Sequence, residues 1–157
     1  GGQERGMRSG TENVGGIAAF AAAIRWNNEE AAAKGKDYLG KLHDMLYDAF
    51  ENTDNISVMC ERNTCAPHIC SISARNVRGE VLLHTLEKRG FYVSTGSACS
   101  SHKKNISHVL QAIGTSRETA EGVIRISLSY SNTKESVEAL INAVKESVHE
   151  LEQYIQK

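Results

Sequence analysis

The sequence predicts an α/β domain of two layers, in which helices cover a small mixed or antiparallel sheet. Segments with helical apolar spacing and segments with strand-like alternation follow one another along the chain, and a long helical pattern closes it. The 157 residues suit one domain of ordinary size. A composition of 40% hydrophobic and 24% charged residues is typical of a globular chain rather than a disordered one.

Two helices are expected in the first third of the chain. Thr11 or Asn13 can cap a helix in which apolar residues recur at helical spacing from Val14 to Ile24. Gly35 indicates a break. A second periodic segment then runs over 39–50.

Strands and shorter helices are expected in the middle of the chain. The strand candidates are 56–60, 68–74, 91–95 and 122–130, of which the last alternates most clearly. Helices are expected over 79–90 and about 107–114. Asn132 and Glu135 have the spacing of a capping box, and a single apolar stripe follows them along a long final helix.

Composition also bears on partners and location. A net charge of -1 argues against a dedicated nucleic-acid binder, and no apolar run approaches the ~20 residues of a membrane span. We therefore expect neither nucleic acid nor membrane as a partner. No secretory signal is visible, so a cytoplasmic location is expected. The first residues lack a starting Met and open in mid-motif, which suggests a piece of a longer protein.

The four cysteines are expected to be reduced, because a chain of this length without a secretory signal does not suggest a disulfide framework. Cys60, Cys65 and Cys70 are separated by four residues each, with His68 nearby. The CxxC spacing of common zinc sites is absent, so no metal site is expected.

Cys99 lies in the stretch VSTGSACSS, where its neighbours are small and polar. A reactive cysteine needs exposure and a stabilised thiolate, and His102, Lys103 and Lys104 could lower its pKa. The alternative is a serine- and glycine-rich turn with an incidental cysteine.

Arg125 stands inside the strand candidate VIRISLS. Alternation places it on one face with Val123 and Ser127, away from the neighbouring isoleucines. Such an arginine is either a surface residue whose stem lies along the sheet or a fork for a carboxylate.

The opening stretch GGQERGMRSGT is glycine-rich but matches neither a P-loop nor a dinucleotide site. Ser9, Gly10 and Thr11 run into a helix N-terminus, where a hydroxyl and backbone amides would suit a phosphate. Arg5 and Arg8 would add charge. The alternative is an ordinary glycine loop with a threonine cap.

Four segments together resemble the C-terminal part of the cysteine desulfurases, which are pyridoxal-phosphate enzymes of fold type I in the class V aminotransferase family. The segments are 1–11, 94–101, 107–114 and 124–128, and their order and separation match as well. The resemblance covers essentially the whole chain. It implies that residues 1–12 are a remnant of the cofactor domain and that 13–157 form the C-terminal small domain.

The resemblance also implies roles for three residues. Cys99 matches the nucleophile that takes sulfur from L-cysteine as a persulfide and releases L-alanine, and its surroundings resemble the group with an extended, mobile cysteine loop. Arg125 matches the arginine that holds the substrate carboxylate. Thr11 matches the threonine that contacts the cofactor phosphate of the neighbouring subunit. The family is homodimeric and passes sulfur to acceptor or scaffold proteins for iron–sulfur clusters or thiolated tRNA.

One departure from the family pattern is large. The lysine that binds pyridoxal phosphate follows a histidine in the cofactor domain, and no lysine of this sequence matches that motif. The chain alone is therefore expected to bind no pyridoxal phosphate covalently and to be inactive. The alternatives are a selenocysteine lyase, another class V transferase, or a sulfur-carrier or interaction domain without catalysis.

Overall fold

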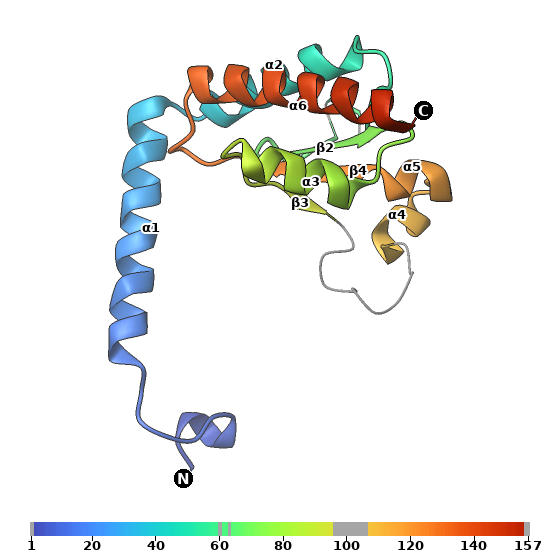
Figure 1. Cartoon of the computed structure of the whole chain (residues 1–157). Helices are drawn as coiled ribbons and strands as arrows, with labels where there is room; N and C mark the ends of the chain where they lie inside the picture. The colour runs from blue at the N-terminus through green and yellow to red at the C-terminus, as the bar shows by residue number, and fades with distance from the viewer. Residues whose placement is uncertain (1, 60, 63, 96–106, 156–157) are drawn as a thin grey trace. The chain divides into compact units, whose positions relative to one another are not determined.

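The computed structural model describes residues 2–59, 61–62, 64–95 and 107–155 (Figure 1). These residues form two compact units, Gly1–Lys36 and Asp37–Lys157. The boundary expected after residue 12 concerns two domains of a longer protein and stays a prediction.

Helices and strands alternate along the chain. The helices are η1 (Glu4–Gly6), α1 (Val14–Lys34), α2 (Tyr38–Glu51), α3 (Gly79–Lys88), α4 (His108–Ala112), α5 (Arg117–Glu121) and α6 (Lys134–Ile155). The strands are β1 (Ile56–Val58), β2 (Ile69–Ala74), β3 (Ser94–Thr95) and β4 (Val123–Ser127).

The first unit consists of the opening segment and α1. Asn13 caps α1, because its side chain accepts a hydrogen bond of 3.1 Å from the amide of Gly16. The helix ends at Gly35, whose φ of 88° lies in the region that favours glycine. Both ends agree with the sequence pattern. No residue of α1 is buried.

The second unit is built on a four-stranded antiparallel sheet with the order β1-β2-β4-β3. In β2, Cys70, Ile72 and Ala74 are buried, and in β4 Ile124 and Ile126 are buried. These alternate positions share one face of the sheet, since opposite residues of antiparallel strands point the same way.

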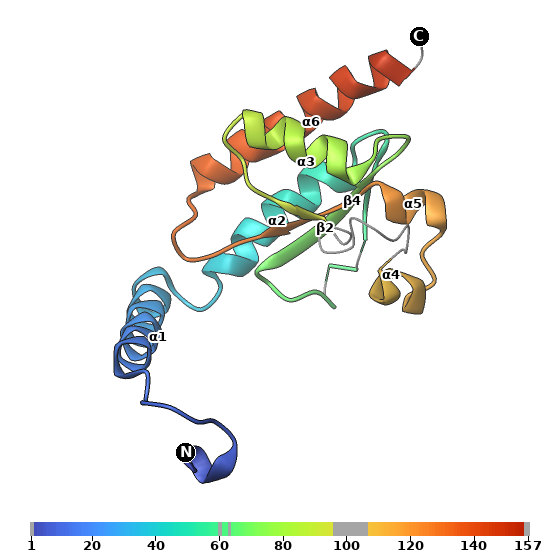
Figure 2. The same cartoon turned by 60° about the horizontal axis from the view of Figure 1, so that its bottom comes forward.

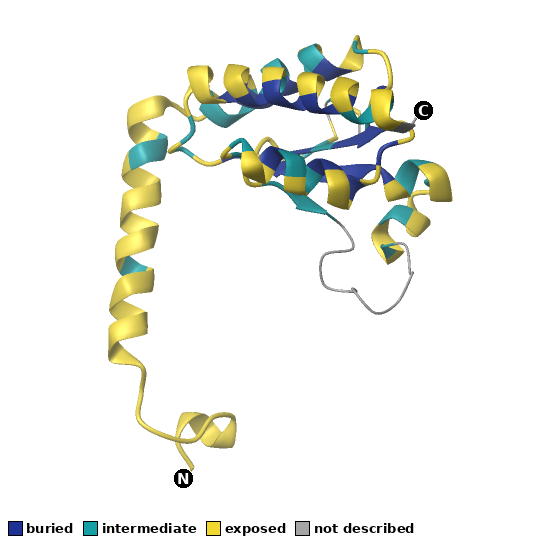
Figure 3. Ribbon diagram, in the orientation of Figure 1, coloured by how far each residue is buried: buried dark blue, intermediate teal, exposed yellow. Residues whose placement is uncertain are grey.

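The helices α2, α3 and α6 cover that apolar face (Figure 2). Of these, α2 and α3 contact the strands, and α6 packs against both helices. The buried residues of α6 form a stripe on the side that meets the rest of the unit, as Figure 3 shows. Together with the sheet, the helices enclose one hydrophobic core, whose fully buried members include Leu46, Phe50, Leu82, Leu86 and Val144. The small antiparallel sheet, the covering helices and the long C-terminal helix confirm the predicted fold class.

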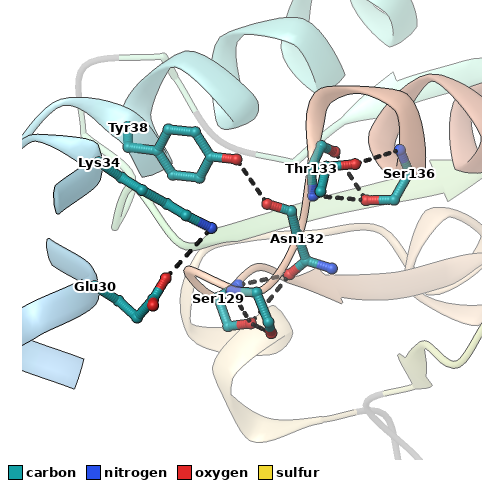
Figure 4. Close-up of polar contacts among 8 residues, drawn as sticks. Glu30, Lys34, Tyr38, Ser129, Asn132, Thr133 and Ser136 are labelled. Atoms are coloured by element: carbon teal, nitrogen blue, oxygen red, sulfur yellow. Dashed lines mark hydrogen bonds and ion pairs between the residues drawn. The ribbon is translucent and has the colours of Figure 1, made fainter. Parts of the chain in front are cut away.

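The start of α6 differs from the expected capping box. Thr133 and Ser136 cap each other: the Ser136 amide donates to Thr133 Oγ1 over 3.2 Å, and the Thr133 amide donates to Ser136 Oγ over 3.0 Å (Figure 4). Asn132 instead accepts from the Ser129 amide at 2.7 Å and closes the preceding turn. The predicted capping box of Asn132 and Glu135 is therefore wrong by one position. Asn132 and Thr133 are adjacent, and either residue type can cap a helix.

Two other elements differ from expectation. The strand expected over 91–95 is reduced to Ser94–Thr95. The helix α5 was not expected; Ser116 caps its start, because the Ser116 hydroxyl accepts from the Thr119 amide at 3.2 Å.

Candidate carboxylate site on the open face of the sheet

Arg125 stands at the middle of β4, which is an inner strand of the sheet. Its neighbours Ile124 and Ile126 are buried, whereas Arg125 is exposed on the opposite face. Ser127 is exposed on the same face, as alternation predicted. Val123 is buried although it shares this face, because it lies opposite Ser73, whose hydroxyl bonds to α5. The face is thus covered at one end and open around Arg125.

The guanidinium of Arg125 differs in its partners from that of Arg62, which holds structural elements together. Arg62 forms ion pairs with Asp44, Asp48 and Glu51. The hydrogen bond to Asp48 contributes most to raising the pKa of Arg62, and the negative charges of the three carboxylates raise it further. Among the residues that the structure describes, no hydrogen bond or ion pair engages the side chain of Arg125.

A similar contrast holds for Arg89, at the end of α3. Its guanidinium spans Glu146 and Glu150 of α6, each at 2.7 Å, and so joins two helices of the core layer. Arg62 and Arg89 have structural partners, whereas no other described residue neutralises the charge of Arg125. A guanidinium suits a carboxylate, which it can bind through two parallel hydrogen bonds.

The strand β3 pairs with β4 in a register that sets Ser94 directly opposite Arg125. The chain therefore passes beside Arg125 just before it enters the segment of the predicted nucleophile. Cys99 itself, with His102, Lys103 and the predicted mobile loop around them, lies outside the described residues.

Thr11 belongs to the other compact unit and is exposed. Arg8 Nη1 donates to the Thr11 carbonyl at 2.7 Å and, less closely, to the Gly10 carbonyl at 3.5 Å. Gly10 has a φ of 101°, which permits this turn. The turn sets a hydroxyl and a guanidinium at neighbouring places, and both suit a phosphate such as that of pyridoxal phosphate. Thr11 and Arg125 belong to separate compact units, and Cys99 is not among the described residues.

The cysteines divide by environment. Cys70 is free and fully buried on the core face of β2, and burial raises the pKa of its thiol to about 11. Such a thiol is a packing group rather than a nucleophile. Cys65 is disulfide-bonded. The expectation of reduced cysteines is therefore wrong for Cys65. Within the described segments, no three His, Cys, Asp or Glu side chains gather as a metal site would require.

Two residues of this open face were not predicted from the sequence. Ser71 on β2 and Ser94 on β3 flank Arg125 from the two neighbouring strands. The strand alternation carried part of the signal, but the register between strands far apart in sequence did not follow from it.

Comparison with known proteins identifies the class. The family model of class V aminotransferases matches residues 2–140, and the chain belongs to this family. Within it, the similar curated proteins include a NifS/IcsS homolog and cysteine desulfurases. The chain is 38% identical over 147 residues to a NifS/IcsS protein homolog of Lactobacillus delbrueckii subsp. bulgaricus, covering 93% of this chain and 38% of that protein. It is 36% identical over 151 residues to the cysteine desulfurase IscS of Pectobacterium carotovorum subsp. carotovorum, covering 96% and 37%.

Solved structures agree. A NifS-like protein superposes with a TM-score of 0.76 at 37% identity, over 93% of this chain and 36% of the other. A second NifS-like protein, from Rickettsia africae, has a TM-score of 0.70 at 32% identity, over 94% and 38%. The chain thus spans little more than a third of the length of the relatives it matches. No helix in the described segments is long and apolar enough to cross a membrane.

Proposed function

We propose that this chain is the C-terminal part of a pyridoxal-phosphate-dependent cysteine desulfurase, which converts L-cysteine to L-alanine and leaves the sulfur on Cys99. One observation carries the proposal. In a chain similar to cysteine desulfurases, a guanidinium that no other described residue engages lies beside the strand that leads directly to the predicted nucleophile. Residues 13–157 would be the small domain, and residues 1–12 a part of the cofactor domain.

Arg125 would bind the carboxylate of L-cysteine. Its backbone is held on both sides by strand pairing, with β2 and with β3, so the guanidinium starts from a fixed position. A fixed anchor lowers the entropic cost of orienting the substrate relative to the reacting thiol. The four-stranded sheet is thus the rigid part of the proposed site.

Cys99 would attack the sulfur of the bound substrate as a thiolate. The S–S bond to Cys99 forms while the C–S bond of the substrate breaks, and the carbon takes up a proton, so that the products are alanine and the Cys99 persulfide. Five residues of extended chain span at most ~18 Å. That length limits the distance of Cys99 from Ser94, and so from Arg125, and allows the thiol to reach both a substrate and an acceptor.

Pyridoxal phosphate, when bound, supplies an electron sink for the carbon skeleton of the substrate. Thr11 would contact its phosphate across the interface of a homodimer, helped by the charge of Arg8. The lysine that holds the cofactor would come from the cofactor domain, so the chain alone is proposed to be inactive. Sulfur-acceptor or scaffold proteins and a cytoplasmic location remain parts of the proposal that rest on the family.

The test is alanine release from L-cysteine by the full-length protein. The parent protein should release alanine, and Cys99→Ser should abolish that release. Arg125→Lys should raise KM for L-cysteine about tenfold or more, because an ammonium cannot form the paired hydrogen bonds of a guanidinium. Arg75→Lys, at an exposed arginine in the turn after β2, is the matched control and should change nothing.

The result that contradicts the proposal is full alanine release by Cys99→Ser. Selenocysteine, assayed in parallel, separates the proposed function from a selenocysteine lyase: a protein that acts on selenocysteine and leaves L-cysteine unchanged is not a desulfurase.

A further inference from the structure

Two serines flank Arg125 across the sheet. Ser71 of β2 and Ser94 of β3 are each the direct antiparallel partner of Arg125. Side chains of directly opposite residues lie on the same face with Cβ atoms about 4.5–5.5 Å apart. One guanidinium is therefore bracketed by two hydroxyls on three adjacent strands. Both serines are half-buried, whereas Arg125 between them is exposed.

Neither hydroxyl has a hydrogen-bond partner in the part of the chain that the structure describes. Ser73, two residues along the same face of β2, shows the contrast, since its hydroxyl donates to the Thr119 carbonyl at 2.6 Å. The serine beside α5 thus has a structural partner, while the two serines beside Arg125 do not.

The arrangement matches the hydrogen-bonding capacity of a carboxylate. A carboxylate offers about four lone-pair sites, of which a bidentate guanidinium takes two. Two hydroxyls, one on each side, can donate to the remaining sites. Serine adds no charge and little bulk, so it leaves the positive charge of Arg125 intact and the space above it open.

We propose that Ser71 and Ser94 are substrate-binding residues that complete the carboxylate site of Arg125. The inference rests on the proposed function for the identity of the ligand as an α-amino acid. The part of the inference that concerns a site for a single carboxylate depends only on Arg125, Ser71 and Ser94 and on the register of their strands. The two claims can therefore fail separately.

The test uses this 157-residue chain and follows the side-chain Nε–H signal of Arg125 by NMR. L-Alanine is the probe, and ethylamine, which lacks the carboxylate, is the negative probe. L-Alanine should shift the signal with saturation, and ethylamine should not. Ser71→Ala and Ser94→Ala should each weaken the apparent affinity about tenfold or more, as expected for one lost hydrogen bond to a charged group.

The matched control is Ser57→Ala. Ser57 is an exposed serine of the edge strand β1, and it pairs with Ser73 rather than with Arg125. This variant should bind L-alanine like the parent chain. Amide spectra of all variants report whether the sheet is intact.

The outcomes separate the two claims. Equal affinities of the parent chain, Ser71→Ala and Ser94→Ala overturn the inference, as does a parent Arg125 signal that does not respond to L-alanine. In the full-length protein, the two variants should raise KM for L-cysteine with little change in kcat, since a binding contact is lost. If the full-length protein releases no alanine while the NMR result holds, the proposed function fails and the carboxylate site stands.

Discussion

Cys70 and Arg125 lie on neighbouring inner strands, and the sheet gives them opposite environments. Cys70 points into the core and packs there with full burial, opposite Ile126. Arg125 points to the open face, where no described carboxylate neutralises it. The pleat alone decides which of these groups is available for chemistry. A thiol on the core face is protected, and a charge on the open face can meet a ligand.

The raised pKa of Cys70 predicts a measurable pH dependence of stability. Burial raises this pKa from 9.0 to about 11, because the thiolate would lose its hydration. The unfolded chain therefore releases this proton at lower pH than the folded chain. The stabilisation is fully present below pH 9 and is lost as the pH rises towards 11, by about 2–3 kcal/mol in total.

Chemical unfolding at several pH values between 8 and 11 checks this, with Cys70→Ala as the reference. The parent chain should lose more free energy of unfolding over this range than the variant. Other groups titrate in both proteins, so only the difference between the two curves counts. Parallel curves would contradict a buried, protonated thiol.

At the scale of elements, close backbone contacts fix how β4 joins α5 and α3. Gly122 ends α5 and begins the approach to β4, and its carbonyl accepts from the Ala74 amide at 3.2 Å. A Cβ on Gly122 would collide with the Ala74 carbonyl and would lie 2.9 Å from Ser73 Oγ. The absence of a side chain therefore lets the strand that carries Arg125 pack against β2.

Substituting this glycine should destabilise the fold. Gly122→Ala is expected to lower the free energy of unfolding by about 2 kcal/mol or more, the usual cost of forcing atoms into a packed region. Gly40→Ala is the matched control, since Gly40 lies in α2 with no atom within 4 Å of an added Cβ. That change should stabilise the chain by about 0.5–1 kcal/mol through helix propensity. Equal effects in urea unfolding would contradict the close approach.

Elements with strong periodicity or clear end signals could be predicted from the sequence. The pattern placed α1 between Asn13 and Gly35, and it placed β4 and α6 nearly at their observed positions. The short helix α5 escaped because five residues hold too little apolar periodicity to stand out. At α6, adjacent residues of similar capping ability left the choice to tertiary contacts, and Thr133 became the cap.

The candidate site could be predicted only in part. Alternation placed Arg125 on an open face, but its neighbours depend on strand pairing over long sequence separations. The partners Ser71 and Ser94 come from segments about 50 and 30 residues away, and a one-residue slip of β2 would have put the core residue Cys70 or Ile72 in the place of Ser71. Composition favoured reduced cysteines, and a single disulfide such as that of Cys65 leaves no compositional trace.

At the scale of the whole molecule, the proposed chemistry is divided among separate parts. The unit Asp37–Lys157 carries its own hydrophobic core and the rigid Arg125. The unit Gly1–Lys36 carries Thr11, and no residue of its helix α1 is buried. An isolated helix is marginally stable in water without tertiary packing. Because the chain spans little more than a third of the length of its relatives, we expect activity only from a protein that also contains the part matching the rest of those relatives.

Mass spectrometry of Cys99 after turnover tests the central claim most directly. The full-length protein is mixed with L-cysteine and digested with trypsin, which releases residues 90–103 as a peptide with Cys99 as its single cysteine. The account predicts the added mass of one sulfur atom on this peptide. The addition should persist in Cys70→Ala and be absent in Cys99→Ser. Alanine release with the sulfur on a different cysteine, or with no sulfur on the protein, would contradict the account.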